Sequence, residues 1–180
     1  MKYNAFITSI IIGTSLFIDT QTFSQETNAY TDPSQQFQIE FPGEPETNKR
    51  TVPTEAGDIV MHTVMYEESP EKVFMLAYSN YPKELIEYSD PEVLLKSAQE
   101  GSMSNLGTSE LSVNEKITYK GYSGLYYEAQ SEELYVAYKI ILVDNRLYQL
   151  AILQQSSPLN ESEVTNYMES FRLKESVSFD

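Results

Sequence analysis

Residues 134–154 read LYVAYKIILV, then DN, then RLYQLAILQ, and this segment decides the fold. Two runs rich in β-branched and aromatic residues flank Asp144-Asn145. Both turn residues tolerate the positive φ that a tight hairpin turn requires, so we predict a β-hairpin. The turn fixes the facing pairs as Leu142 with Leu147, Ile140 with Gln149 and Tyr138 with Ala151 on one face, and Ile141 with Tyr148, Lys139 with Leu150 and Ala137 with Ile152 on the other. Because both faces are largely apolar, we expect this hairpin in the middle of a sheet that is covered on each side.

The first 24 residues have the pattern of a secretory signal peptide. Lys2 gives a positive start, and residues 5–18 form an apolar core, which is shorter than the about 20 residues that span a bilayer. Small side chains favour cleavage after Ser24, and an uncleaved signal anchor is the alternative. We therefore expect a secreted or periplasmic protein, with residues 25–36 as a flexible leader and residues 37–175 as one domain.

The chain is strongly acidic, with a formal net charge of −15 at pH 7. This charge argues against nucleic acid or anionic lipid as a partner, because both would be repelled. It leaves Ca²⁺ and basic protein surfaces as electrostatically suitable partners. The chain has no cysteine, which excludes disulfides, thiolate metal sites and lipid attachment to a cysteine. We expect no cofactor.

Periodicity and turn residues predict further strands and two helices. Besides the hairpin, the predicted strands are residues 37–41, 51–52, 59–67, 73–81, 111–119 and 122–130. Asp90 as N-cap with Pro91 in the first turn starts one helix, and Asn160 with Glu163 starts the other. An apolar stripe at helical spacing follows each cap. Gly124 inside a strand indicates a bulge or a close backbone approach. The order predicts an α+β domain with a mainly antiparallel sheet, flanked by helices on both faces.

Five short motifs follow one another through nearly the whole chain after residue 36. They are FPGEP at 41–45, YSNYP at 78–82, GYSG at 121–124, RLYQL at 146–150 and SFRL at 170–173. In this order they resemble the PsbP-like superfamily, which includes an extrinsic photosystem II subunit, a Ran-binding nuclear import factor and many secreted bacterial proteins. The resemblance implies an α-β-α sandwich. It implies no catalytic residues, because this fold serves unrelated functions and the family shares no catalytic motif.

His62 is the only histidine in the chain, and it shares a strand face with Val60 and Val64. A Ser-His-Asp triad centred on it would lack the Gly-x-Ser-x-Gly motif of many hydrolases. A zinc site would need three oxygen ligands beside this single imidazole. We therefore predict a structural or surface histidine and no catalytic site. A hydrolase that uses His62 or paired carboxylates is the minor alternative.

Two groups of residues are candidates for binding. Glu67, Glu68 and Glu71 gather in one predicted hairpin loop and offer oxygen ligands for Ca²⁺, although no Asp-x-Asp-x-Asp-Gly spacing accompanies them. The chain also contains 14 tyrosines, whose rings and hydroxyls often line binding surfaces. The tyrosines that we single out as a candidate surface are Tyr126, Tyr127, Tyr135 and Tyr138. Since Tyr126 and Tyr127 are adjacent in a strand, at least one of them should lie in the core.

The absence of a catalytic constellation, together with the predicted signal peptide, indicates a function in binding. We predict a non-enzymatic binding or accessory module whose partner is another extracytoplasmic protein. A protein that binds a small ligand or Ca²⁺, through a tyrosine-lined or acidic pocket, is the alternative.

Overall fold

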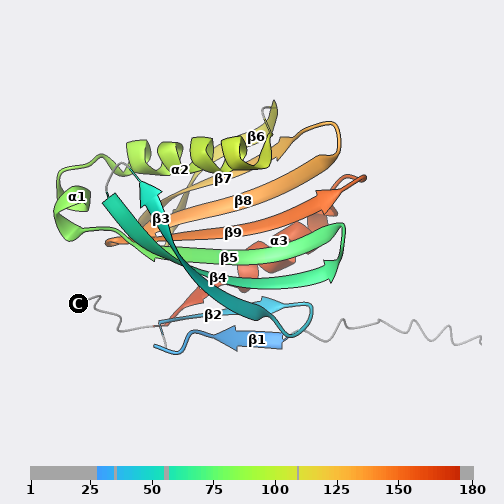
Figure 1. The fold of residues 1–180 in the computed structure, drawn as a ribbon, viewed down its shortest axis with the longest axis horizontal. Coiled ribbons are helices and arrows are strands. Elements are labelled where there is room, and N and C mark those ends of the chain that lie inside the picture. The colour runs from blue at the N-terminus through green and yellow to red at the C-terminus, as the bar shows by residue number, and fades with distance from the viewer. Residues whose placement is uncertain (1–27, 35, 55–56, 109, 175–180) are drawn as a thin grey trace, which may run out of the picture.

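The computed structural model describes residues 28–34, 36–54, 57–108 and 110–174 (Figure 1). The predicted signal peptide and residue 175 lie outside these ranges. The elements are β1 (Asn28–Thr31), β2 (Phe37–Phe41), β3 (Glu46–Thr54), β4 (Gly57–Ser69), β5 (Lys72–Asn80), α1 (Lys83–Glu87), α2 (Pro91–Leu106), β6 (Glu110–Tyr119), β7 (Tyr122–Gln130), β8 (Leu134–Val143), β9 (Arg146–Gln155), α3 (Glu161–Ser170) and β10 (Arg172–Leu173). Within the described residues, no helix combines the length and the apolarity that crossing a membrane requires.

The predicted antiparallel α+β class is confirmed, and the hairpin lies where the sequence places it. Seven strands form one sheet in the order β3-β4-β5-β9-β8-β7-β6, and β1, β2 and β10 form a smaller sheet. The hairpin β8–β9 therefore has a strand on each side. All six facing pairs predicted from the turn are found, and Asp144 adopts a φ of 50°. A local turn signal thus sets the register of the central strands.

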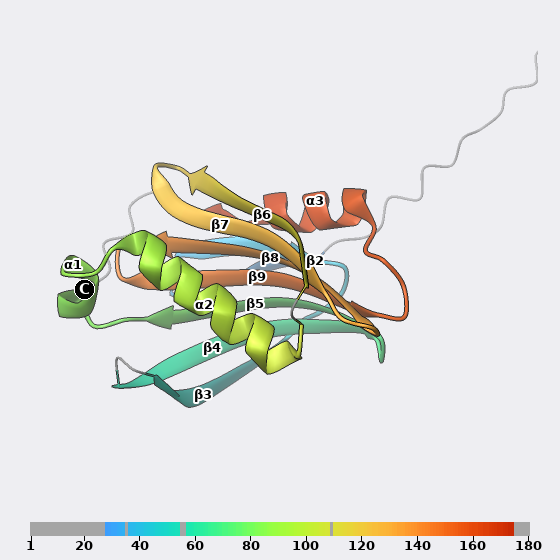
Figure 2. The same ribbon diagram turned by 90° about the horizontal axis from the view of Figure 1, so that it is seen from above.

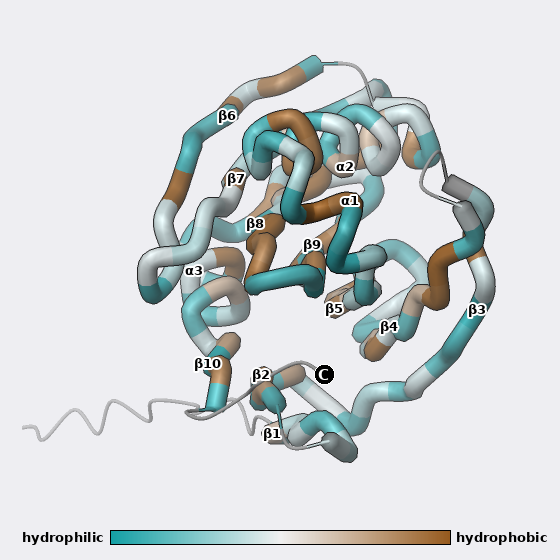
Figure 3. Tube along the Cα trace, turned by 90° about the vertical axis from the view of Figure 1, so that its left-hand side faces the viewer, coloured by the Kyte–Doolittle hydropathy of each residue, from teal (hydrophilic) through white to brown (hydrophobic). Residues whose placement is uncertain are grey.

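The two faces of the large sheet belong to two separate apolar clusters. On one face, Leu95 of α2 packs with Tyr138, Ile140 and neighbouring residues of β7, β8 and β9. On the other face, residues of β2 and α3 pack together against the sheet, with Phe37 and Phe171 fully buried. This second face is therefore covered by strand β2 together with helix α3, whereas the sequence predicted a helix alone. Figure 3 shows the hydrophobic colouring of β8 and β9 inside this assembly.

Both long helices begin at the predicted caps. The Asp90 carboxylate accepts a hydrogen bond from the Glu92 backbone N–H at 2.9 Å, and Pro91 occupies the first turn of α2. The Asn160 side chain accepts from the Glu163 backbone N–H at 3.1 Å at the start of α3. Each side chain satisfies a backbone donor that the helix itself leaves without a partner. Short-range sequence signals therefore suffice to locate both helices.

Part of the predicted leader is ordered, which corrects the expectation for residues 25–36. Residues 28–31 form β1, which pairs antiparallel with β2. The ring of Tyr30 packs 6.2 Å from that of Phe37, so one aromatic side chain in a polar segment anchors this strand. Strand β3 is also longer than the predicted 51–52. The prediction was too short because the mostly polar residues of β3 show too little alternation to indicate an edge strand. Helix α1 and the short strand β10 were not predicted.

Candidate binding groove

Helix α2 covers only part of its face of the large sheet. It contacts β7 and β8, and seen from above it crosses the sheet with β3 and β4 lying beyond it on one side (Figure 2). Between α2 and these outer strands lies a groove of about 560 Å³. Ligand-binding clefts in proteins commonly have volumes of roughly 300–1,000 Å³. We call this space the methionine groove.

Antiparallel pairing aligns the floor of the groove in rows that cross the strands. Met65 of β4 lies opposite Met75 of β5, and Ala77 lies opposite Gln149 of β9. Residues two apart in a strand share a face, so Met61 lies on the same side of β4 as Met65. The floor residues that line the groove are Met61, Thr63 and Met65 of β4, Met75 and Ala77 of β5, Tyr138 of β8, and Gln149 and Leu153 of β9.

The walls of the groove are a strand and a helix of different character. The strand wall consists of Glu46, Thr47, Asn48 and Arg50 of β3, and the helix wall consists of Ala98, Gly101, Ser102, Asn105 and Leu106 of α2. Small side chains on the helix wall leave its backbone open to approach. Gly101 is exposed, and a Cβ atom added to it would have no atom within 4 Å, so this point of the wall has room for a larger side chain.

The three groove methionines, Met61, Met65 and Met75, form an apolar surface that is partly open to solvent. Met65 is 40% exposed, and Met61 and Met75 are half-buried. Methionine is flexible and polarizable, so it adapts to apolar partners of different shape. Apolar residues that gather in a concave site make it a candidate binding site.

Arg50 brings a positive charge to one end of the groove. It lies opposite Met61 in the register of β3 and β4, and its Nη2 atom is 3.8 Å from the Met61 sulfur. No carboxylate of the described residues forms an ion pair with it. Its neighbour Lys49 lies opposite His62 and therefore faces the other side of the strand. Glu46, four residues before Arg50, also lines the groove.

Gln149 places an amide in the centre of the groove floor. Its neighbours on this face of β8 and β9 are apolar, among them Tyr138, Ile140 and Leu147. The side chain is half-buried. In the part of the chain that the structure describes, its amide forms no hydrogen bond. A half-buried amide on an apolar floor is therefore available to a bound molecule.

His62 lies on the opposite face of the sheet from the groove. Its ring stacks on that of Tyr78, with centroids 4.7 Å apart, and the Tyr78 hydroxyl donates a hydrogen bond to buried Asp32 at 3.0 Å. Burial, followed by the positive charges of Lys49 and Arg146, lowers the pKa of His62, while Asp32 opposes this shift. Among the described residues, no serine or carboxylate hydrogen-bonds to His62, so the structure brings together no triad around it.

The three candidate calcium ligands are not gathered into one site. Glu68 forms an ion pair with Lys72 at 3.3 Å, and Lys72 also pairs with Glu163 at 2.5 Å. Glu67 and Glu71 are exposed. No three acidic or histidine side chains within the described ranges lie close enough to hold one metal ion. Calcium binding by this loop stays a prediction.

The four candidate tyrosines do not form one surface. Tyr127 and Tyr138 are buried and stack on each other at 5.1 Å, and burial raises the pKa of Tyr138 to about 12. Tyr126 packs against the cluster on the other face, and its hydroxyl donates to the Glu128 carboxylate. Tyr135 is half-buried at a strand end. Of the four, Tyr138 lines the methionine groove, so one residue of the predicted surface belongs to the site.

Sequence reasoning missed most of the groove. Met61 and Met65 share the same parity within one strand, and Met75 follows the turn at the distance that places it opposite Met65. That signal is present in the sequence, but it has meaning only once the register is known. The contribution of α2 depends on where the helix crosses the sheet, which no local pattern encodes.

Of the comparisons with known proteins, the one with solved structures supports this fold. No family model matches the sequence, and no curated protein does. Among solved structures, the chain is similar to the solution structure of cyanobacterial PsbP (CyanoP) from Synechocystis sp. PCC 6803, with a TM-score of 0.53 and 11% sequence identity over 91% of this chain and 99% of that chain. At this identity the likeness concerns the fold alone. The chain thus has a PsbP-like fold, as the order of its sequence motifs predicted.

Proposed function

We propose that this chain is a secreted or periplasmic, non-enzymatic binding or accessory module for another extracytoplasmic protein, and that the methionine groove is its binding site. The observation that carries this proposal is the groove of about 560 Å³, in which three methionines line a part of the sheet that α2 leaves uncovered. A cleft of this size with an adaptable apolar floor suits binding.

The predicted α-β-α sandwich is part of this proposal. The groove requires α2 to stand on one face of the sheet while β2 and α3 fill the other face. The two apolar clusters, one with Leu95 of α2 and the other with residues of β2 and α3, support this arrangement. Were both faces fully covered, the sheet would have no surface left for a ligand. The partial cover of one face is thus the feature that we connect with function.

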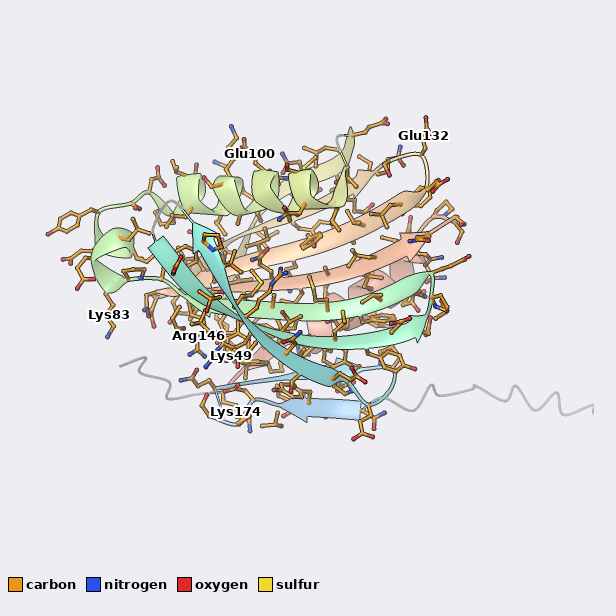
Figure 4. All side chains as sticks on the ribbon, viewed as in Figure 1. Lys49, Lys83, Glu100, Glu132, Arg146 and Lys174 are labelled. Carbon is orange, nitrogen blue, oxygen red and sulfur yellow. The ribbon has the colours of Figure 1, made fainter. Side chains whose placement is uncertain are left out.

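The test of this function blocks the groove without touching the core. Gly101→Trp places a large ring in the empty space of the helix wall. Glu100→Trp is the matched control, because Glu100 is the preceding residue of α2, is 66% exposed and points away from the sheet (Figure 4). A photo-crosslinking residue at Met65 should yield adducts with a partner protein in cells that export the chain. Gly101→Trp should remove these adducts, and Glu100→Trp should keep them.

Binding of 1-anilinonaphthalene-8-sulfonate to the purified protein gives a second measure of the site. This anionic dye binds apolar surfaces through its aromatic rings. It should bind the native chain and the Glu100→Trp variant, with much weaker binding to Gly101→Trp. Circular dichroism confirms that each variant is folded. If the crosslinker at Met65 yields no adduct and the dye binds Gly101→Trp as well as it binds the native chain, the groove is not a binding site and the proposal fails.

A further inference from the structure

The strand wall of the methionine groove carries a positive side chain near one end and a negative side chain near the other. Arg50 and Glu46 both line it, and four residues of a strand separate them by about 13 Å. A ligand that lies along this wall therefore meets a guanidinium at one end and a carboxylate at the other. Guanidinium groups bind carboxylates through two parallel hydrogen bonds. The anionic group of a ligand consequently belongs at the Arg50 end.

The amide of Gln149 selects the kind of ligand that covers it. It lies in the floor on β9, three strands from β3, in the cross-strand row that starts at Asn48 midway between Glu46 and Arg50, and it forms no hydrogen bond with the described residues. A plain acyl chain over this amide would remove it from water and give it no partner, which is unfavourable. The backbone of an extended peptide offers both N–H and C=O groups that can hydrogen-bond to the Gln149 amide. The floor therefore favours a peptide over an acyl chain.

The methionines define the side chains that such a peptide carries. An extended peptide points every second side chain towards the floor, where Met61, Met65 and Met75 provide apolar contacts that adapt to different shapes. About four extended residues cover the distance between Glu46 and Arg50. The net charge of −15 repels acidic peptides. We therefore expect a ligand with a single negative group, the one that pairs with Arg50.

We propose that the methionine groove binds the apolar C-terminal tail of another protein in an extended conformation, with the terminal carboxylate paired to Arg50 and the backbone hydrogen-bonded to Gln149. This inference rests on the proposed function and names the part of the partner that is bound. The carboxylate fixes the direction of the tail, since the preceding residues run towards Glu46. The methionines make the site tolerant of the apolar sequence.

The experiment uses two pooled libraries of hexapeptides whose last four residues are apolar and varied. One library ends in a free carboxylate and the other in an amide, and laurate serves as an acyl-chain probe. Retained peptides are identified by mass spectrometry, and the Kd of the best one is measured by fluorescence anisotropy. The carboxylate form should bind at least about tenfold more tightly than its amide, as expected for a hydrogen-bonded charge pair.

Variants of two adjacent residues separate the role of Arg50 from that of charge in general. Arg50→Gln should bind the carboxylate and amide forms equally. Lys49→Gln removes the same charge from the next residue, whose register partner His62 lies on the opposite face, and should keep the preference. Gln149→Leu should weaken binding of both peptide forms and leave laurate binding unchanged or stronger.

The outcomes distinguish this inference from the proposed function. If laurate binds and no peptide is retained, or if Arg50→Gln keeps the preference for the carboxylate, the C-terminal tail is wrong as the ligand. The groove remains a binding site in either case if Gly101→Trp abolishes dye binding. If neither peptides nor laurate bind, and Gly101→Trp leaves dye binding unchanged, both proposals are wrong.

Discussion

His62 gives the chain a pH response that does not require any catalytic role. It stacks on Tyr78, and its burial, with Lys49 and Arg146 nearby, lowers its pKa below the ordinary 6.5, despite the opposing charge of Asp32. The folded chain therefore binds a proton at His62 less readily than the unfolded chain does. The neutral imidazole contributes stability above pH 6.5, and this contribution is lost as the pH falls through the pKa of the folded state.

We predict that His62→Gln is less sensitive to mild acid than the native chain. The free energy of unfolding of both proteins should be measured by urea denaturation from about pH 8 to about pH 5. Carboxylates titrate in both proteins, so the difference between the two curves isolates the histidine. The native chain should lose more stability than the variant over this range. Parallel curves would show that the His62 pKa is the same in the folded and unfolded chain.

Two glycines inside regular elements have opposite surroundings at the position of an added methyl group. In β7, a Cβ atom at Gly124 would lie 2.7 Å from the backbone oxygen of Ile140 and 2.9 Å from Cγ1 of Ile117. The predicted close backbone approach at this glycine is confirmed. In α2, a Cβ atom at Gly101 would meet nothing within 4 Å. Strand β7 therefore needs its glycine for packing, whereas α2 does not.

We predict that Gly124→Ala destabilises the chain by about 1–3 kcal/mol, because the backbone of β8 has to move to relieve the overlap. Gly101→Ala should instead stabilise it by about 0.5–1 kcal/mol, because alanine is the better helix residue. Urea denaturation of both variants gives the two values. Equal effects of the two substitutions would mean that β7 and β8 do not approach each other as closely as the structure shows.

Signals carried by neighbouring residues predicted the elements, and contacts between distant elements produced the groove. The DN turn fixes the hairpin register, and Asp90 and Asn160 start the helices, because each of these effects acts within a few residues. The side chain of Arg50 reaches the groove only because β3 pairs with β4. Gln149 was visible in the sequence as the polar member of an apolar face, but its exposure depends on α2 covering β7 and β8 and leaving β4 free.

At the scale of the whole molecule, the excess of acidic residues acts on both stability and binding. A net charge of −15 creates repulsion within the compact chain, and this repulsion is weaker over the larger dimensions of the unfolded chain. Salt screens charges separated by more than about 10 Å at 0.1 M. It leaves short pairs such as Lys72 with Glu163, at 2.5 Å, much less affected. Added salt should therefore remove more repulsion than attraction.

We predict that the urea midpoint of unfolding rises as NaCl increases from about 10 mM to about 200 mM, the range over which the Debye length falls most steeply. A double variant, Glu132→Lys with Glu133→Lys, provides the comparison, because both residues are exposed and lie in the turn between β7 and β8, with Glu132 labelled at the end of the sheet in Figure 4. This variant carries less excess charge and should respond less steeply to salt. If the native chain loses stability on addition of NaCl, attractive pairs outweigh the net repulsion, and acidity then acts through specific contacts rather than through the field of the whole molecule.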